Sequence, residues 1–178
     1  MHYMGVPTIV YASLLFVFCL SFVICFAIKG FKKGWRTIYK IALVEILFLI
    51  YGSTVFFRKY VETRGHNFQP FWSYKAIENG EEFYIEENFL NFLFFLPVGL
   101  LLGCAFRSMT WWKVMMIGFC VSASIEIMQY VHNRGFAEVD DVMHNTLGCL
   151  VGYGIYKLAK YGLERINGVN ENGNNRDR

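Results

Sequence analysis

The chain has 178 residues and a formal net charge of +3; 55% of the residues are hydrophobic and only 17% are charged. Soluble domains usually carry about 25% charged residues. Here the charges are gathered in short segments between long apolar ones, which is typical of membrane helices joined by loops. The small net charge, with no basic patch interleaved with aromatic residues outside the apolar segments, argues against nucleic-acid binding.

Five apolar segments are long enough to cross a membrane, because about 20 helical residues span the roughly 30 Å hydrocarbon core. The first has no charged residue, no basic region before it and no Ala-x-Ala site after it. We therefore interpret it as a retained helix rather than a signal peptide. The expected spans are residues 7–28, 38–57, 89–106, 114–131 and 142–161.

The loops between these spans predict the orientation of the chain. Residues 29–40 include five basic residues and no acidic one, and short loops rich in Lys and Arg stay in the cytoplasm. Alternation then places 107–113 and 157–165, which are also basic, inside, and 58–88 and 132–141 outside. We expect an all-α integral membrane protein, N-out and C-in, with an outer loop between its second and third helices.

The domain organisation is simple, since neither an internal repeat nor a second domain is evident. We expect one transmembrane domain over residues 1–163. Residues 164–178 are rich in Asn and Gly, and we expect them to form a disordered cytoplasmic tail.

Neither a metal nor another cofactor is expected. The five cysteines all lie in apolar segments without a Cys-x-x-Cys pair, which favours simple packing over a disulfide framework or zinc ribbon. His66, His132 and His144 are expected on the outer side, but their spacing fits no zinc signature such as His-Glu-x-x-His.

Polar residues inside membrane helices are costly and are usually functional. On the fourth span Ser122, Glu126, Gln129 and Asn133 follow one another at spacings of four, three and four, which places them on one helical face. Asn91 lies in the first outer turn of the third span.

On the fifth span Asp141 and Asn145 share a face with Gly148 and Gly152. The polar residues of the third, fourth and fifth spans therefore lie at similar depth near the outer leaflet. We therefore expect them to converge on one pocket.

Small residues predict close packing of two of these helices. Gly99 and Gly103, like Gly148 and Gly152, form Gly-x-x-x-Gly pairs, which let helix backbones approach closely in lipid. Pro97 removes a backbone hydrogen bond, so we expect a kink beside the polar residues.

Charged residues next to the polar face have further expected roles. Arg134 is within reach of Glu126, and Asp140 or Asp141 is placed to cap the fifth helix. Glu45, in the middle of the second span, is more consistent with helix packing than with catalysis.

The ordered motifs resemble the VanZ-like family of bacterial membrane proteins over residues 39–160. Gln69 departs from the family pattern, which has an aliphatic residue there. The matching motifs are NFQPF at 67–71, NFLFFLPVG at 91–99, EIMQ at 126–129, RGFAEVDD at 134–141 and NTLG at 145–148.

The resemblance implies a multi-pass protein of a Gram-positive cytoplasmic membrane and lowered susceptibility to teicoplanin-like lipoglycopeptides. The resemblance and the shared depth of the polar groups together predict a set of ligand-binding residues. Its members are Asn91, Glu126, Gln129, Arg134, Asp140, Asp141 and Asn145.

Three functions remain open from the sequence. The first is binding or modification of an outer-leaflet ligand: a phospholipid, a lipid-linked cell-wall precursor or a lipoglycopeptide. There Glu126 acts as acid, base or hydrogen-bond acceptor, and Arg134 grips an anionic head group. The second is an intramembrane acid–base enzyme using Glu126 and an aspartate. The third is a purely structural polar cluster that holds the helices together. The sequence does not identify the ligand, the oligomeric state or whether there is catalytic turnover.

Overall fold

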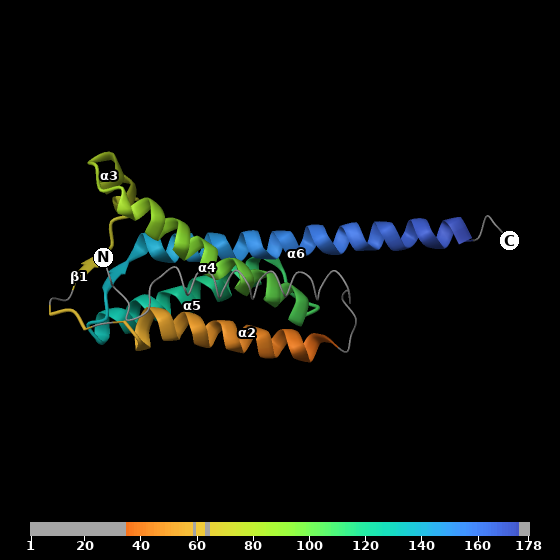
Figure 1. Cartoon of the computed structure of the whole chain (residues 1–178), viewed down its shortest axis with the longest axis horizontal. Coiled ribbons are helices and arrows are strands. Elements are labelled where there is room, and N and C mark those ends of the chain that lie inside the picture. Colours follow the sequence, from red (N-terminus) through yellow and green to blue (C-terminus); the bar gives the residue numbers. More distant parts are fainter. Residues whose placement is uncertain (1–34, 59, 63–64, 175–178) are drawn as a thin grey trace.

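The computed structural model describes residues 35–58, 60–62 and 65–174 (Figure 1), with side chains described as far as residue 166. The first expected span, residues 7–28, lies outside the described residues. The elements are α2 (Arg36–Tyr51), the π-helical turn η2 (Gly52–Phe56), β1 (Gly65–Asn67), α3 (Trp72–Glu78), α4 (Phe83–Ala105), α5 (Trp111–Val131), β2 (Phe136–Glu138) and α6 (Val139–Asn174).

Three helices of the described part are long and apolar enough to cross a membrane: α2 continued by η2, α4 and α5. They correspond to the expected spans 38–57, 89–106 and 114–131. The fifth expected span, 142–161, lies within α6, whose apolar stretch is diluted by His144, Asn145 and Lys157.

The C-terminal helix is longer than the sequence predicts. α6 continues as a helix to Asn174, so residues 164–174, which the sequence predicts to be disordered, are helical. No proline interrupts this stretch, and Lys160 pairs with Glu164 at 3.7 Å, one helical turn apart. As a result α6 projects well beyond the ends of the other helices (Figure 1).

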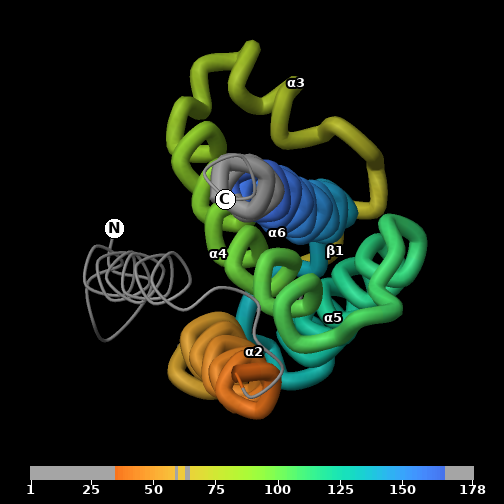
Figure 2. The backbone as a smooth tube through the Cα atoms, turned by 90° about the vertical axis from the view of Figure 1, so that its right-hand side faces the viewer, coloured from red at the N-terminus to blue at the C-terminus, as the bar shows by residue number. Residues whose placement is uncertain are grey.

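The long helices pack around α4. α4 makes its most extensive contact with α6, while α5 also packs on α6 and α2 packs on α4. The view along the helices in Figure 2 shows α4 between α2 and α6, with α5 beside them. The core between them is apolar, and its most deeply buried side chains include Ile46, Phe95, Leu101, Val114 and Tyr153.

Glycines bring the backbones of α4 and α6 into direct contact. A Cβ atom added to Gly99 would lie 1.7 Å from the carbonyl oxygen of Cys149. A Cβ on Gly148 would lie 2.0 Å from the carbonyl oxygen of Phe92, and Gly152 repeats the arrangement one turn later. The prediction of close packing at these glycines is confirmed, because no side chain fits in that space.

One end of the bundle has structure where the sequence predicts only loops. β1 and β2 form a parallel two-stranded sheet in which His66 pairs with Ala137. β1 follows α2 and β2 follows α5, so the sheet joins the connections at the same end of the two helices. Gly65 makes this pairing possible, since a Cβ there would lie 1.6 Å from the ring of Phe136.

The end of α2 is loosened by two hydroxyl groups. Ser53 Oγ and Thr54 Oγ1 both donate to the carbonyl oxygen of Ile50, at 3.0 and 2.7 Å. Such side-chain bonds compete with the helical hydrogen-bond ladder, and the helix widens here into the π-helical turn η2. π-Helical turns often occur beside functional sites.

We expect Gly148→Ala to destabilise the protein, because its methyl group would collide with the α4 backbone. Overpacking of this kind costs about 1–3 kcal/mol, which is a loss of several degrees in melting temperature. Gly162→Ala is the matched control: Gly162 lies on the same helix with nothing within 4 Å of an added Cβ, so the alanine should be neutral or slightly stabilising. Equal melting of the two purified variants would contradict the close contact.

Candidate ligand-binding site

Glu126 faces the interior and binds the backbone of the following loop. Its side chain is 6% exposed, and Oε2 accepts a hydrogen bond of 3.0 Å from the backbone N–H of Glu138. Ser122 and Gln129, on the same face of α5, are also buried. The spacing of these three residues therefore identified the inward face of α5.

Arg134 does not pair with Glu126, contrary to the prediction. α5 ends in a left-handed turn at Asn133, with φ of 52°, and the N–H of Arg134 donates to the carbonyl of Gln129 at 2.8 Å. This is the hydrogen-bond pattern of a Schellman cap. It turns the Arg134 side chain toward the end of η2, where Nη1 donates to the backbone carbonyl of Arg58.

Arg58, not Arg134, supplies the positive charge among the carboxylates. Its guanidinium lies against Gly135, where an added Cβ would be 2.8 Å from Nη1 and 3.0 Å from Cζ. It is close enough to act electrostatically on four carboxyl groups. These belong to Glu87 on α4, Glu126 on α5, Glu138 on β2 and Asp141 on α6.

These five residues form what we call the Arg58 cluster. Among the described residues, no basic side chain lies within 4.0 Å of any of its four carboxylates. The ion pair that the described residues do contain, Lys160–Glu164, lies farther along α6. The cluster thus has more acidic than basic groups, and none of them is directly neutralised within the described part of the chain.

Four buried polar side chains near this cluster keep an unused hydrogen-bonding atom. Asn145 Nδ2 donates to Ser122 Oγ at 2.7 Å, and Gln129 Nε2 donates to the carbonyl of Thr54 at 3.1 Å. The other atom of each amide has no partner among the described residues, and neither has Asn91 Nδ2 or Asp141 Oδ1. Most buried polar atoms in proteins are paired. Asn91 and Asp141 interact with one another, so the side-chain oxygens of Gln129 and Asn145 are the atoms most available to a ligand.

Asp140 anchors α3 instead of capping its own helix. Its side chain is 1% exposed. One carboxylate oxygen accepts from the N–H of Phe71 at 2.6 Å, and the other accepts from the N–H and the hydroxyl of Ser73 at 2.9 and 2.7 Å. Asn88 adds a bond of 3.1 Å to the same hydroxyl. Asp140 therefore caps α3 across the bundle end, since Phe71 is the N-cap residue of that helix.

The protonation of Glu138 depends on its burial and on the neighbouring carboxyl groups. Glu138 lies in β2, outside the candidate membrane helices. Burial raises the pKa of its carboxyl group to about 8, and the negative charges of Asp141 and Glu87 add to that shift. Its proton is therefore held more tightly in the folded protein than in the unfolded chain.

Only part of the predicted site comes together as expected. Glu126 and Asp141 act on one another electrostatically, and Asn91 lies beside Asp141. Arg134 and Asp140 instead hold backbone segments in place. Among the described residues no group of three His, Cys, Asp or Glu side chains is arranged to hold a metal ion.

Three residues of the cluster were not predicted from the sequence: Arg58, Glu87 and Glu138. Arg58 comes directly after the second expected span, and Glu87 lies two residues before the third. Both therefore lie at the predicted outer ends of their spans, toward which the polar face of α5 also extends. A search for charged residues at the span ends would have found them, whereas Glu138 is brought in only by the pairing of β2.

We expect the stability contributed by Glu138 to fall as pH rises. A carboxyl group with a raised pKa contributes fully below its ordinary value near 4.5 and loses that contribution as pH passes about 8. Glu138→Gln is neutral throughout, so between pH 5 and pH 9 its melting temperature should fall less than that of the wild type. Allowing for solvent screening, a difference of roughly 1 kcal/mol corresponds to about 2–4 °C.

The control for this experiment is Glu78→Gln, at an exposed carboxylate at the end of α3. Its melting curve should follow that of the wild type at every pH. Parallel curves for the wild type and Glu138→Gln would show that Glu138 is not buried against other carboxylates.

Comparisons with known proteins identify the family. Protein VanZ of Enterococcus faecium is 30% identical over 69 residues, which are 39% of this chain and 43% of that protein. The chain thus matches less than half the length of this curated relative. No solved structure matches. The family model VanZ/LLP1 matches residues 8–160, which include the helices and motifs described above. The chain therefore belongs to the VanZ/LLP1 family.

Proposed function

We propose that this VanZ-like protein binds the head group of an amphiphilic cell-envelope ligand at the Arg58 cluster. In a Gram-positive host, this binding lowers susceptibility to teicoplanin-type lipoglycopeptides. The chain lies in the cytoplasmic membrane with five spans, the N-terminus outside and the C-terminus inside. In this orientation the cluster, at the ends of η2 and α5 and the starts of α4 and α6, faces the outer leaflet.

The observation that supports binding most is the uneven charge of the Arg58 cluster. Four carboxyl groups interact electrostatically with one guanidinium, and within the described part of the chain none of the four forms an ion pair within 4.0 Å. Buried charges are stable only when they are paired or protonated. A ligand with a positively charged group, such as an amine, would supply the missing partner. The excess of carboxylates favours such a ligand over the anionic head group expected from Arg134.

Two other functions each have one observation in their favour. The bonds of Glu126, Gln129 and Asn145 to neighbouring elements are also what a purely structural cluster needs. The electrostatic interaction between Glu126 and Asp141 suits an acid–base pair, because neighbouring carboxyl groups separate their pKa values. A lipid product released by the purified protein would favour the enzyme.

The proposed orientation predicts different labelling of two introduced cysteines. In a background without the native cysteines, Asn79→Cys should react with an impermeant thiol reagent on intact cells, and Ser108→Cys should not. Both positions are exposed: Asn79 follows α3, and Ser108 lies in the turn between α4 and α5. Labelling of position 108 from outside would reject this topology.

Glu126→Gln tests whether the carboxylate acts on a ligand. Glutamine keeps the size and can still accept the bond from Glu138, so insertion and melting should be unchanged. Losing a hydrogen bond to a charged group costs about 1.5–3 kcal/mol, which weakens ligand binding roughly 10- to 100-fold. Expressing cells should then be as susceptible to teicoplanin as cells without the protein.

Glu45→Gln is the matched control, because Glu45 is an exposed carboxylate on α2 away from the cluster. It should retain the wild-type susceptibility. Destabilisation of Glu126→Gln together with its loss of effect would instead support the structural function. Full resistance with Gln at position 126 would remove the carboxylate from the mechanism, and a wild-type protein without effect would separate this chain from the resistance role.

A further inference from the structure

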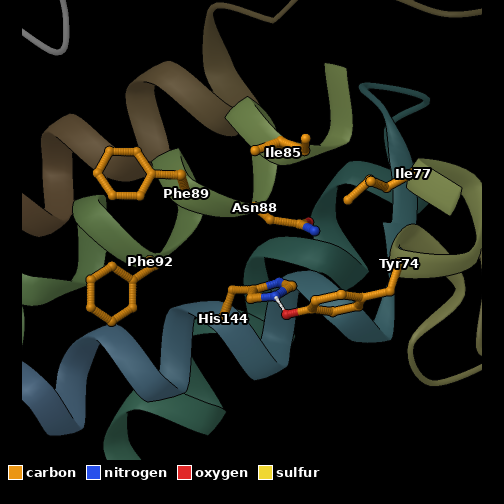
Figure 3. A pocket seen from close by; sticks show the side chains of 7 residues that line it. All are labelled: Tyr74, Ile77, Ile85, Asn88, Phe89, Phe92 and His144. Atoms are coloured by element: carbon orange, nitrogen blue, oxygen red, sulfur yellow. Dashed lines mark hydrogen bonds between the residues drawn. The ribbon is translucent and has the colours of Figure 1, made fainter. Parts of the chain in front are cut away.

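A second feature lies at the same end of the bundle as the Arg58 cluster: a groove between α3, α4 and α6 (Figure 3). Its volume is about 320 Å³, which is near the lower end for small-molecule pockets. Ile77 of α3 and Ile85, Phe89 and Phe92 of α4 supply its apolar wall. Ile85 and Phe89 are 54% and 59% exposed, so the wall is open on one side.

Three polar residues close one side of the groove. The Tyr74 hydroxyl and His144 Nε2 form a hydrogen bond of 2.8 Å (Figure 3), and Asn88 lies nearby in the lining. His144 is only 9% exposed, and its Nδ1 atom has no partner of normal hydrogen-bond geometry among the described residues, although the backbone of Asp140 lies near the ring. A buried ring nitrogen in a groove wall without a partner is an unsatisfied polar group.

The groove has no charged side chain in its lining, although charged residues are its neighbours in the chain. Asn88 follows Glu87, a member of the Arg58 cluster, and His144 lies one helical turn after Asp140. Asp140 also holds the start of α3 in place through Phe71 and Ser73. An uncharged, mainly apolar groove thus lies at the same end of the bundle as the Arg58 cluster.

We propose that this groove holds one acyl chain of a membrane lipid, with the polar start of the chain at His144. An uncharged wall of isoleucine and phenylalanine side chains suits an alkyl chain, and a small volume suits a single chain rather than a bulky ring system. When Tyr74 donates to Nε2, the Nδ1–H of His144 is left as a donor, and an ester carbonyl provides the acceptor that it lacks.

In combination with the proposed function, the occupant is the tail of the amphiphile whose amine-bearing head group lies at the Arg58 cluster. That link depends on the proposed function, but occupation of the groove by an acyl chain does not. The two can therefore be tested apart.

The test uses the full-length protein in nanodiscs containing phosphatidylethanolamine with a diazirine on one acyl chain. After illumination, cross-linked peptides are identified by mass spectrometry. Insertion should be several-fold higher at Ile85 and Phe89 than at Phe119 and Ile127 of α5, which are 51% and 61% exposed and do not line the groove. Equal insertion at all four positions would overturn the proposal, because it would reflect exposure to bulk lipid alone.

Three variants make the result specific. Ile85→Trp fills the groove at an exposed position and should lower insertion at Phe89 several-fold, whereas Ile127→Trp should leave it unchanged. His144→Phe keeps a ring but removes the donor, and should shift the insertion sites along the chain, whereas an unchanged pattern would contradict a role for Nδ1. Melting curves establish that each variant is folded.

The remaining outcomes also decide between explanations. Cross-links from groove residues to a second copy, or to residues 1–34 of the same chain, in place of lipid would overturn the proposal. Groove labelling that persists in Glu126→Gln, while the wild type has no effect on teicoplanin susceptibility, would reject the proposed function and keep the acyl-chain site. If the wild type confers resistance but shows no enrichment of cross-links in the groove, the acyl-chain site is rejected and the proposed function is kept.

Discussion

The direct backbone contact between α4 and α6 is the constraint on which the arrangement depends. Gly99, Gly148 and Gly152 leave no room for a side chain between the two helices. The contact fixes the depth and rotation of α6 against α4, and so places Asp141 and Asn145 opposite Asn91 and its neighbours. In lipid, where apolar surface alone gives helices little reason to associate, such close packing supplies much of the attraction.

Residues of the loops and strands next to these packed helices complete the site. The turn after α5 sends Arg134 to the end of η2, the parallel pair of β1 and β2 brings Glu138 to Glu126, and Asp140 fixes α3. Each of these bonds uses a polar atom for structure. Within the described residues, a few buried polar atoms are left without a hydrogen-bond partner, and the carboxylates of the Arg58 cluster have no ion pair.

The sequence predicted the features that follow from helical periodicity. The apolar runs located three spans, the glycine spacing indicated the α4–α6 contact, and the spacing of Ser122, Glu126 and Gln129 indicated one buried face. It failed where loops determine the partners: a left-handed residue at Asn133 redirects Arg134, and a pairing between distant loops delivers Glu138. Such contacts depend on the tertiary arrangement, which periodicity in one chain does not encode.

The Arg58 cluster is proposed to bind a positively charged group of an amphiphile. Native mass spectrometry of protein purified gently from Gram-positive membranes tests it most directly, with Asp141→Asn as the comparison because the amide keeps the shape and removes one charge. An amine-bearing amphiphile should be retained by the wild type and largely lost from Asp141→Asn. Equal retention by both proteins, or a wild type that retains only anionic lipids, would contradict it.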